Sequence, residues 1–229
     1  MMISPESYYE MNLKGKSEEE IRSAIRGLKR EIGHLKNVME HPSYGTQVLM
    51  CPTEDVRIQF NRMYLERAKQ ALFEMGASYT PSRVELRAER FQENIDCIRK
   101  IEFYIGGFFG SRETCTVSID GEHIRYDTER FFDRNAFSLP DSIGNGMSKA
   151  DFLDALRELY MGEWQSTYRT ERFGYVVMDG TQWSLKIEYS NGTRTAYFSG
   201  SNAYPYNFDK LKALFGIEDD EEEDFQEDE

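Results

Sequence analysis

The sequence predicts an α+β fold in which a helical part precedes an antiparallel sheet. Between residues 17 and 100, apolar residues recur at spacings of three and four, the period of amphipathic helices. From residue 101 onward, short alternating segments are separated by Asp-Gly and Asn-Gly pairs, a pattern typical of hairpins. We therefore expect a helical domain over residues 1–100, an antiparallel α+β domain over 101–217 and an acidic tail over 218–229.

Three helices are expected in the first part. Ser17 and Glu20 have capping-box spacing, and the apolar seam that follows, Ile21–Met39, covers about three heptads. Further helices are expected over residues 53–75 and 80–100, and the short connections indicate an antiparallel helical layer. The seam could pack within the chain or between two copies, so self-association remains an open alternative.

The clearest strand pattern covers residues 182–189, where every second side chain is apolar. Asn191-Gly192 follows and predicts a two-residue type I′ turn, with residues 193–198 as the returning strand. Residues 175–178 precede an Asp-Gly pair and have strand composition. The three segments together predict a three-stranded antiparallel meander.

An earlier strand and hairpin are expected in the same domain. Residues 101–105 have strand composition, and residues 114–126 form a hairpin pattern around an Asp-Gly pair. Residues 131–146 are rich in turn-forming types and are expected to be a loop. Two short helices should begin at Ser148 and Asn207, whose side chains can cap a first turn.

Three short stretches carry a resemblance to other proteins. They are Trp183-Ser-Leu185, Tyr189-Ser-Asn-Gly192 and Gly200-Ser-Asn-Ala-Tyr-Pro205. With these stretches, residues 148–217 resemble a domain of uncharacterised bacterial proteins, often small and often carried on mobile elements. The resemblance implies a shared fold and assigns no activity.

Composition indicates where the protein works. No apolar run approaches the roughly 20 residues that span a bilayer, and the first residues lack the apolar core of a signal peptide. Cys51, Cys97 and Cys115 are widely spaced and odd in number. A disulfide framework is therefore disfavoured, and we expect a cytoplasmic location.

Signatures of catalysis are missing from the sequence. His34, His41 and His123 are far apart and lack the spacing of metal ligands. The glycine-rich segment over residues 106–110 lacks the GxxxxGK[ST] pattern, so a strand bulge or a close backbone approach explains it better than phosphate binding. No cysteine or serine lies in a nucleophile motif. We predict no catalytic residue, metal or cofactor.

Basic side chains line the outer faces of the first and third expected helices. They are candidates for binding nucleic-acid phosphates, and the face on each helix follows the spacing of three and four. Glutamates interleave with them, which favours a solvated face with i,i+4 ion pairs. The candidates are Arg22, Arg26, Lys29, Arg30, Arg83, Arg87 and Arg90.

Negative charge is concentrated at one end of the sequence. The net charge is −13, yet residues 1–217 carry 28 basic and 31 acidic side chains. The remaining ten acidic side chains lie in residues 218–229, which contain no basic side chain. A segment with so many like charges cannot build a core. It is either a solubilising tail or a competitor for a basic surface, with two turn tyrosines as further contacts. The partner-binding candidates are Tyr204, Tyr206, Glu218, Asp219, Asp220, Glu221, Glu222, Glu223, Asp224 and Phe225.

These patterns favour a non-enzymatic protein that binds another macromolecule. The leading hypothesis is an inhibitor or accessory factor, of the kind encoded by mobile elements against host defences, which covers a basic nucleic-acid-handling surface of a partner protein. The first alternative is direct nucleic-acid binding by the basic helix faces in residues 1–100. The second alternative is an enzyme whose signature is unfamiliar.

Overall fold

The computed structural model describes residues 2–45, 51–107, 112–132, 135–139, 147–177 and 179–217, and it confirms the α+β class. Its contacts divide the chain into two compact units. The first comprises residues 1–86 and 203–206, and the second comprises 87–202 and 207–229. Residues 87–100, which the sequence suggested were helical-domain residues, thus belong to the second unit. The acidic tail lies outside the described residues.

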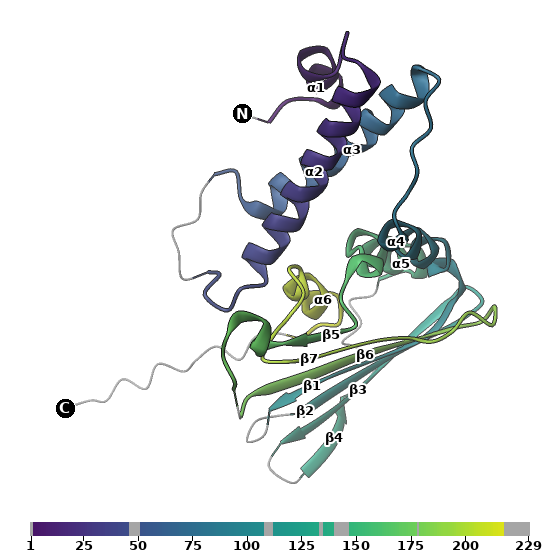
Figure 1. The fold of residues 1–229 in the computed structure, drawn as a ribbon. Coiled ribbons are helices and arrows are strands. Elements are labelled where there is room, and N and C mark those ends of the chain that lie inside the picture. The colour runs from purple at the N-terminus through teal and green to yellow at the C-terminus, as the bar shows by residue number, and fades with distance from the viewer. Residues whose placement is uncertain are drawn as a thin grey trace. The chain divides into compact units, whose positions relative to one another are not determined.

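The first unit is built from helices. They are α1 (Pro5–Asn12), α2 (Glu18–Met39), α3 (Glu54–Glu74) and the first residues of α4 (Arg83–Glu93). Helices α2 and α3 run antiparallel, as Figure 1 shows. Helix α1 was not predicted, although Ser4 caps it and Pro5 occupies its first turn. Those two residues are the usual signal of a helix start.

The predicted seam of α2 forms the core of this unit. Its apolar residues from Ile21 to Leu35 are buried against an apolar face of α3 that includes Ile58 and Leu72. Tyr8 of α1 stacks on Tyr64 of α3 with ring centroids 4.3 Å apart. The seam therefore packs within the chain. The Ser17–Glu20 capping box is also present as predicted.

The half-buried carboxylate of Glu85 links α4 to α2 in the first unit. Glu85 accepts hydrogen bonds from Lys29 Nζ at 2.7 Å, Tyr79 Oη at 2.6 Å and the Ser82 backbone N–H at 2.9 Å. Burial raises the pKa of Glu85, but these hydrogen bonds outweigh it and lower the pKa to about 2. Glu85 therefore stabilises the unit above its unfolded pKa, near 4.5, and this contribution is lost as the pH falls through about 2.

Replacing Glu85 by glutamine should reduce this acid sensitivity. We expect Glu85→Gln to lower the urea midpoint of helix unfolding at pH 7, while the difference from the parent protein shrinks between pH 4.5 and 2. Circular dichroism of urea titrations at three pH values measures this. Glu66→Gln, which removes an exposed partner of Lys69, is the control. A pH-independent difference for Glu85→Gln would contradict the assignment.

Over its described residues, the second unit contains a seven-stranded sheet with the order β4-β3-β2-β1-β6-β7-β5. Neighbouring strands are antiparallel except β5 and β7, which are parallel. The bounds are β1 (Ile98–Gly107), β2 (Arg112–Asp120), β3 (His123–Phe132), β4 (Asn135–Leu139), β5 (Thr167–Arg169), β6 (Thr181–Tyr189) and β7 (Ala196–Ser201).

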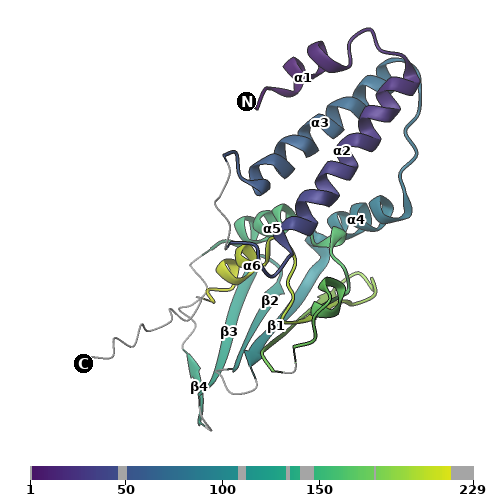
Figure 2. The same ribbon diagram turned by 60° about the vertical axis from the view of Figure 1, so that its left-hand side comes forward.

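Helices cover one face of this sheet, as Figure 2 shows for α5 (Lys149–Glu158) and α6 (Phe208–Leu214). Phe103 of β1 lies 5.9 Å from Phe208 and 5.2 Å from Phe215 between ring centroids. The opposite face carries ion pairs, such as Lys186 with Glu102 at 3.1 Å. The alternation predicted for residues 182–189 is confirmed, because the apolar face of β6 is buried.

One predicted helix and one predicted loop have different boundaries in the structure. The third helix ends at Glu93, a 3₁₀ turn follows over Ile95–Cys97, and β1 begins at Ile98. This strand replaces the last turn because Ile98 and the residues after it pair with β6 along its whole length. Part of the expected loop over residues 131–146 forms β4 beside β3.

The predicted meander was wrong in its first strand, whereas β6 and β7 pair antiparallel as expected. Residues 175–177 are not a strand, and residue 178 lies outside the described residues. Strand β1 occupies the position beside β6 where this segment was expected. The β6–β7 connection is a loop over residues 190–195, because the Asn191 side chain bonds the Thr193 N–H and the Asn94 side chain instead of closing a two-residue turn.

Candidate functional site

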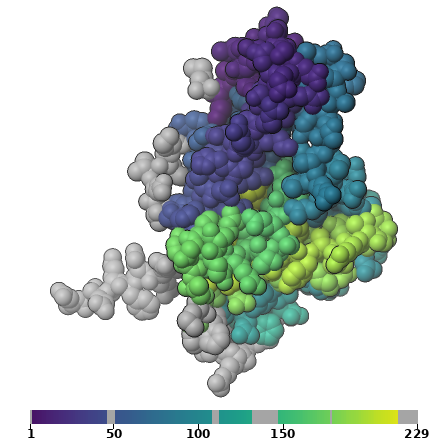
Figure 3. Space-filling model, in the orientation of Figure 1, coloured from purple at the N-terminus to yellow at the C-terminus, as the bar shows by residue number. Residues whose placement is uncertain are grey.

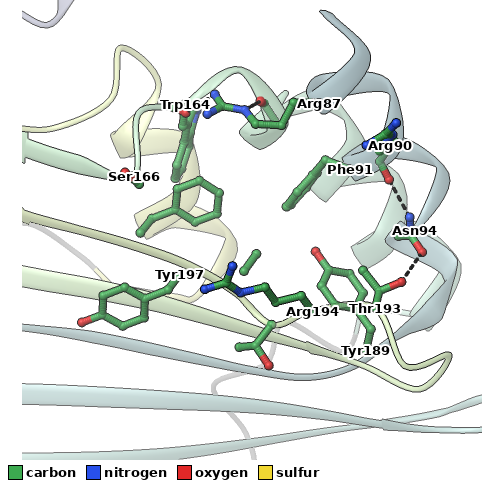
Figure 4. Close-up of a pocket in the computed structure, with 14 residues that line it drawn as sticks. Arg87, Arg90, Phe91, Asn94, Trp164, Ser166, Tyr189, Thr193, Arg194 and Tyr197 are labelled. Atoms are coloured by element: carbon green, nitrogen blue, oxygen red, sulfur yellow. Dashed lines mark hydrogen bonds between the residues drawn. The ribbon is translucent and has the colours of Figure 1, made fainter. Parts of the chain in front are cut away.

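A hollow of about 640 Å³ lies in the second unit between α4 and the β6–β7 hairpin. Figure 3 shows the hairpin, coloured yellow-green, at the surface beside blue-teal α4. Figure 4 shows the residues that line the hollow. Its walls are Arg87, Arg90, Phe91, Asn94, Gly162, Trp164, Ser166, Tyr189, Thr193, Arg194, Thr195, Ala196, Tyr197 and Phe198.

One wall depends on a glycine. A Cβ at Gly162 would lie 2.7 Å from the Ala88 Cα and 2.8 Å from the Phe91 Cβ, so only glycine allows α4 to approach this segment. Arg87 then donates hydrogen bonds to the carbonyl oxygens of Gly162, at 3.2 Å, and Trp164, at 2.7 Å. Arg87 is therefore a structural clamp that also contributes positive charge.

Asn94 connects the end of α4 to the hairpin loop. Its Oδ1 accepts hydrogen bonds from Asn191 Nδ2 at 2.7 Å and Thr193 Oγ1 at 2.9 Å. Its Nδ2 donates to the Arg90 carbonyl at 2.7 Å. These bonds, two of which Figure 4 draws, hold the loop before β7 in place and so position Arg194 at the hollow.

The charge of the hollow is positive. Arg87, Arg90 and Arg194 line it, and none of the described residues that line it is acidic. Within the described part of the chain, the Arg90 and Arg194 side chains are exposed and have no ion-pair partner. Both guanidinium groups are thus available to an anion, and each offers five donors in a planar fork.

Aromatic rings form the inner surface. Phe198 lies 6.2 Å from Phe91 and 5.6 Å from Trp164 between ring centroids. Figure 4 shows the Tyr189 hydroxyl pointing toward Phe91. Burial raises the pKa of Tyr189 to about 12, so its hydroxyl stays protonated at neutral pH and can donate a hydrogen bond. Apolar rings and cationic groups therefore share one cavity.

The β7 backbone adds donors and acceptors at the same place. The Ser199 N–H bonds the Ser166 carbonyl at 3.1 Å, and β5 pairs with β7 only from Ser199 onward. Backbone groups two residues apart in a strand point to the same side. The N–H and C=O of Tyr197 therefore point to an edge that β5 does not cover, next to the hollow.

The predicted basic residues have different environments. In the first unit Arg22 pairs with Glu18 at 2.8 Å, Arg26 with Glu19 at 3.1 Å and Lys29 with Glu85 at 2.7 Å. Arg30 and Arg83 are exposed. Arg87 and Arg90 of α4 line the hollow, where Arg194, absent from the predicted set, joins them.

The two predicted contact tyrosines belong to the first unit. Tyr206 packs against the helical core, its hydroxyl accepts a hydrogen bond from Arg62 at 3.1 Å, and Lys36 lies 5.1 Å from its ring centroid. Tyr204, two residues earlier in the chain, is half-buried. The acidic candidates Glu218–Asp224 and Phe225 lie outside the described residues.

Two kinds of feature are absent from the described ranges. No three His, Cys, Asp or Glu side chains gather there in a way that could hold a metal ion. No helix there combines the length and apolar character needed to cross a membrane. Comparisons with family models, curated proteins and solved structures give no match to this chain.

Proposed function

We propose that the second unit binds single-stranded nucleic acid in the hollow between α4 and the β6–β7 hairpin. The observation that carries this proposal is the combination, among the described residues, of Arg90 and Arg194 without ion-pair partners, aromatic walls and no acidic lining residue. Arginine binds phosphate oxygens, and aromatic rings stack on exposed bases. A single strand presents both groups together, whereas a duplex keeps its bases stacked.

The proposed phosphate contacts are fewer than the basic residues that the sequence suggested. The ion pairs of Arg22, Arg26 and Lys29 leave less free positive charge on α2, so Arg90 and Arg194 are the principal phosphate contacts. A volume of about 640 Å³ lies in the range that accommodates a small organic ligand. We place the activity in the cytoplasm, which the three unpaired cysteines support.

Fluorescence anisotropy tests the proposal. Labelled single-stranded octanucleotides, the corresponding duplexes and polyglutamate are titrated with the full chain at two salt concentrations. We expect the single strand to bind most tightly and its affinity to fall with salt, because phosphate contacts release counterions. Equal affinity for polyglutamate, which has no rings, would contradict the proposal, as would the absence of single-strand binding.

A second candidate function rests on the segregation of charge. Residues 218–229 carry ten acidic and no basic side chains, which supports a protein-binding inhibitor or accessory factor that covers a partner's basic surface. Polylysine serves as the probe. Removing residues 218–229 should abolish salt-sensitive binding to it, and unchanged binding would eliminate the tail from this role.

A further inference from the structure

A second hollow, of about 370 Å³, lies on the sheet of the second unit. The strand register aligns Tyr104 of β1, Ser184 of β6, Ser199 of β7 and Thr167 of β5 in one row across four strands. Gln182, Ser201 and Arg169 form the next row. The buried alternate residues Trp183 and Tyr168 show that both rows face away from the aromatic core.

The chemistry of this hollow complements that of the first. Its side chains offer hydroxyl and amide groups and one cation, Arg169, and none of the described residues that line it is acidic. Hydroxyls and amides hydrogen-bond to sugars, base edges and phosphates without requiring a full charge on the ligand. A neutral, donor-rich row on the other face of the sheet from the aromatic rings of the arginine-lined hollow suits a ligand that extends beyond one phosphate and passes around the edge of β7.

Tyr197 connects the two hollows. It lines both of them, and 55% of its surface is exposed. It lies on β7 opposite Lys186, two residues before Ser199 of the hydroxyl row. Its ring is on the face of the hydroxyl row, Phe198 of the first hollow is on the other face, and β5 pairs with β7 only from Ser199 onward. The exposed ring is therefore placed to stack on a base of a strand that passes around this edge of β7.

We propose that the nucleic acid crosses Tyr197, with one nucleotide in the arginine-lined hollow and the next along the Tyr104–Ser184–Ser199–Thr167 row. The inference rests on the proposed function and specifies its ligand as an oligonucleotide of two or more residues. A mononucleotide would fill the first hollow only. Tyr197 is a contact residue in this arrangement, and its ring, not its hydroxyl, is the required group.

A length series tests this inference with a mononucleotide, a dinucleotide, a tetranucleotide and an octanucleotide, each as DNA and as RNA. Stacking of one base on an aromatic ring changes affinity by about 5- to 150-fold. We therefore expect at least a fivefold gain between the mononucleotide and the tetranucleotide. Tyr197→Ala should remove that gain, so that the tetranucleotide loses more affinity than the mononucleotide, while Tyr197→Phe should retain it.

The control is Phe131→Ala, which removes an exposed ring from β3, four strands away from β7. It should leave the length dependence unchanged. Equal affinity for all lengths, or equal losses in Tyr197→Ala for the mononucleotide and the tetranucleotide, would overturn the two-hollow path while leaving the first hollow as a binding site. Absence of binding at every length would overturn the proposed function and this inference together.

Discussion

Replacing Arg90 and Arg194 together by alanine is expected to weaken single-strand binding by about 100-fold or more. Hydrogen bonds to charged groups contribute about 1.5–3 kcal/mol each, and every 1.4 kcal/mol is about tenfold in affinity. Neither side chain has an ion-pair partner among the described residues, so the loss falls on the ligand contact and not on the fold. Anisotropy titrations of the octanucleotide measure the change.

A charge-matched control separates a local effect from a general one. Arg99→Ala with Arg125→Ala removes two exposed arginines that pair with Glu188 and Asp127 on other parts of the sheet. We expect this control to change affinity by less than about threefold and to leave most of the salt dependence intact. In the Arg90/Arg194 variant, the slope of log affinity against log salt concentration should fall by about two, because about one unit is lost with each phosphate contact. Equal effects of the two pairs would refute a specific site.

Trp183→Ala should destabilise the second unit by about 3–5 kcal/mol, the usual cost of truncating a buried large aromatic side chain. Trp183 is 2% exposed, and its ring centroid lies 4.8 Å from Phe208, 5.9 Å from Tyr168 and 6.4 Å from Trp164. These rings join β6 to α6 and to the segment that forms one wall of the hollow. Urea unfolding followed by circular dichroism measures the loss.

The neighbouring residue provides the control for that variant. Gln182 is exposed on the opposite face of β6, so Gln182→Ala should change the free energy of unfolding by less than about 0.5 kcal/mol. Circular dichroism is preferred to fluorescence because Trp183 is one of only two tryptophans. A loss below about 1 kcal/mol for Trp183→Ala would show that this aromatic cluster is not the core of the sheet.

Regular periodicity was the part of the fold that could be predicted from the sequence. The Ile21–Met39 seam, the Ser17–Glu20 cap and the alternation in β6 each depend on residues close together in the chain. The helix-to-strand change at Ile98 depends on pairing with residues about ninety positions later, and no local pattern reports that. The same long-range pairing displaced residues 175–177 from the sheet.

The candidate site was only partly accessible to sequence analysis. The i,i+3 and i,i+4 spacing identified Arg87 and Arg90, but nothing in the sequence distinguishes these from Arg22 and Arg26, which form ion pairs. Arg194 and Tyr197 line the hollow on a segment that Asn94 fixes through Asn191 and Thr193. Their signal, an Asn after a helix and an Asn-Gly before a strand, is too common to specify a site.

Binding of nucleic acid between α4 and the β6–β7 hairpin should be visible residue by residue in solution. Backbone amide chemical shifts of the ¹⁵N-labelled chain, recorded during titration with a single-stranded tetranucleotide, test it most directly. We expect the largest shift changes at Asn94, Arg194 and Tyr197, which line the hollow. Changes confined to the paired basic residues of α2, or no change at saturating ligand, would contradict it.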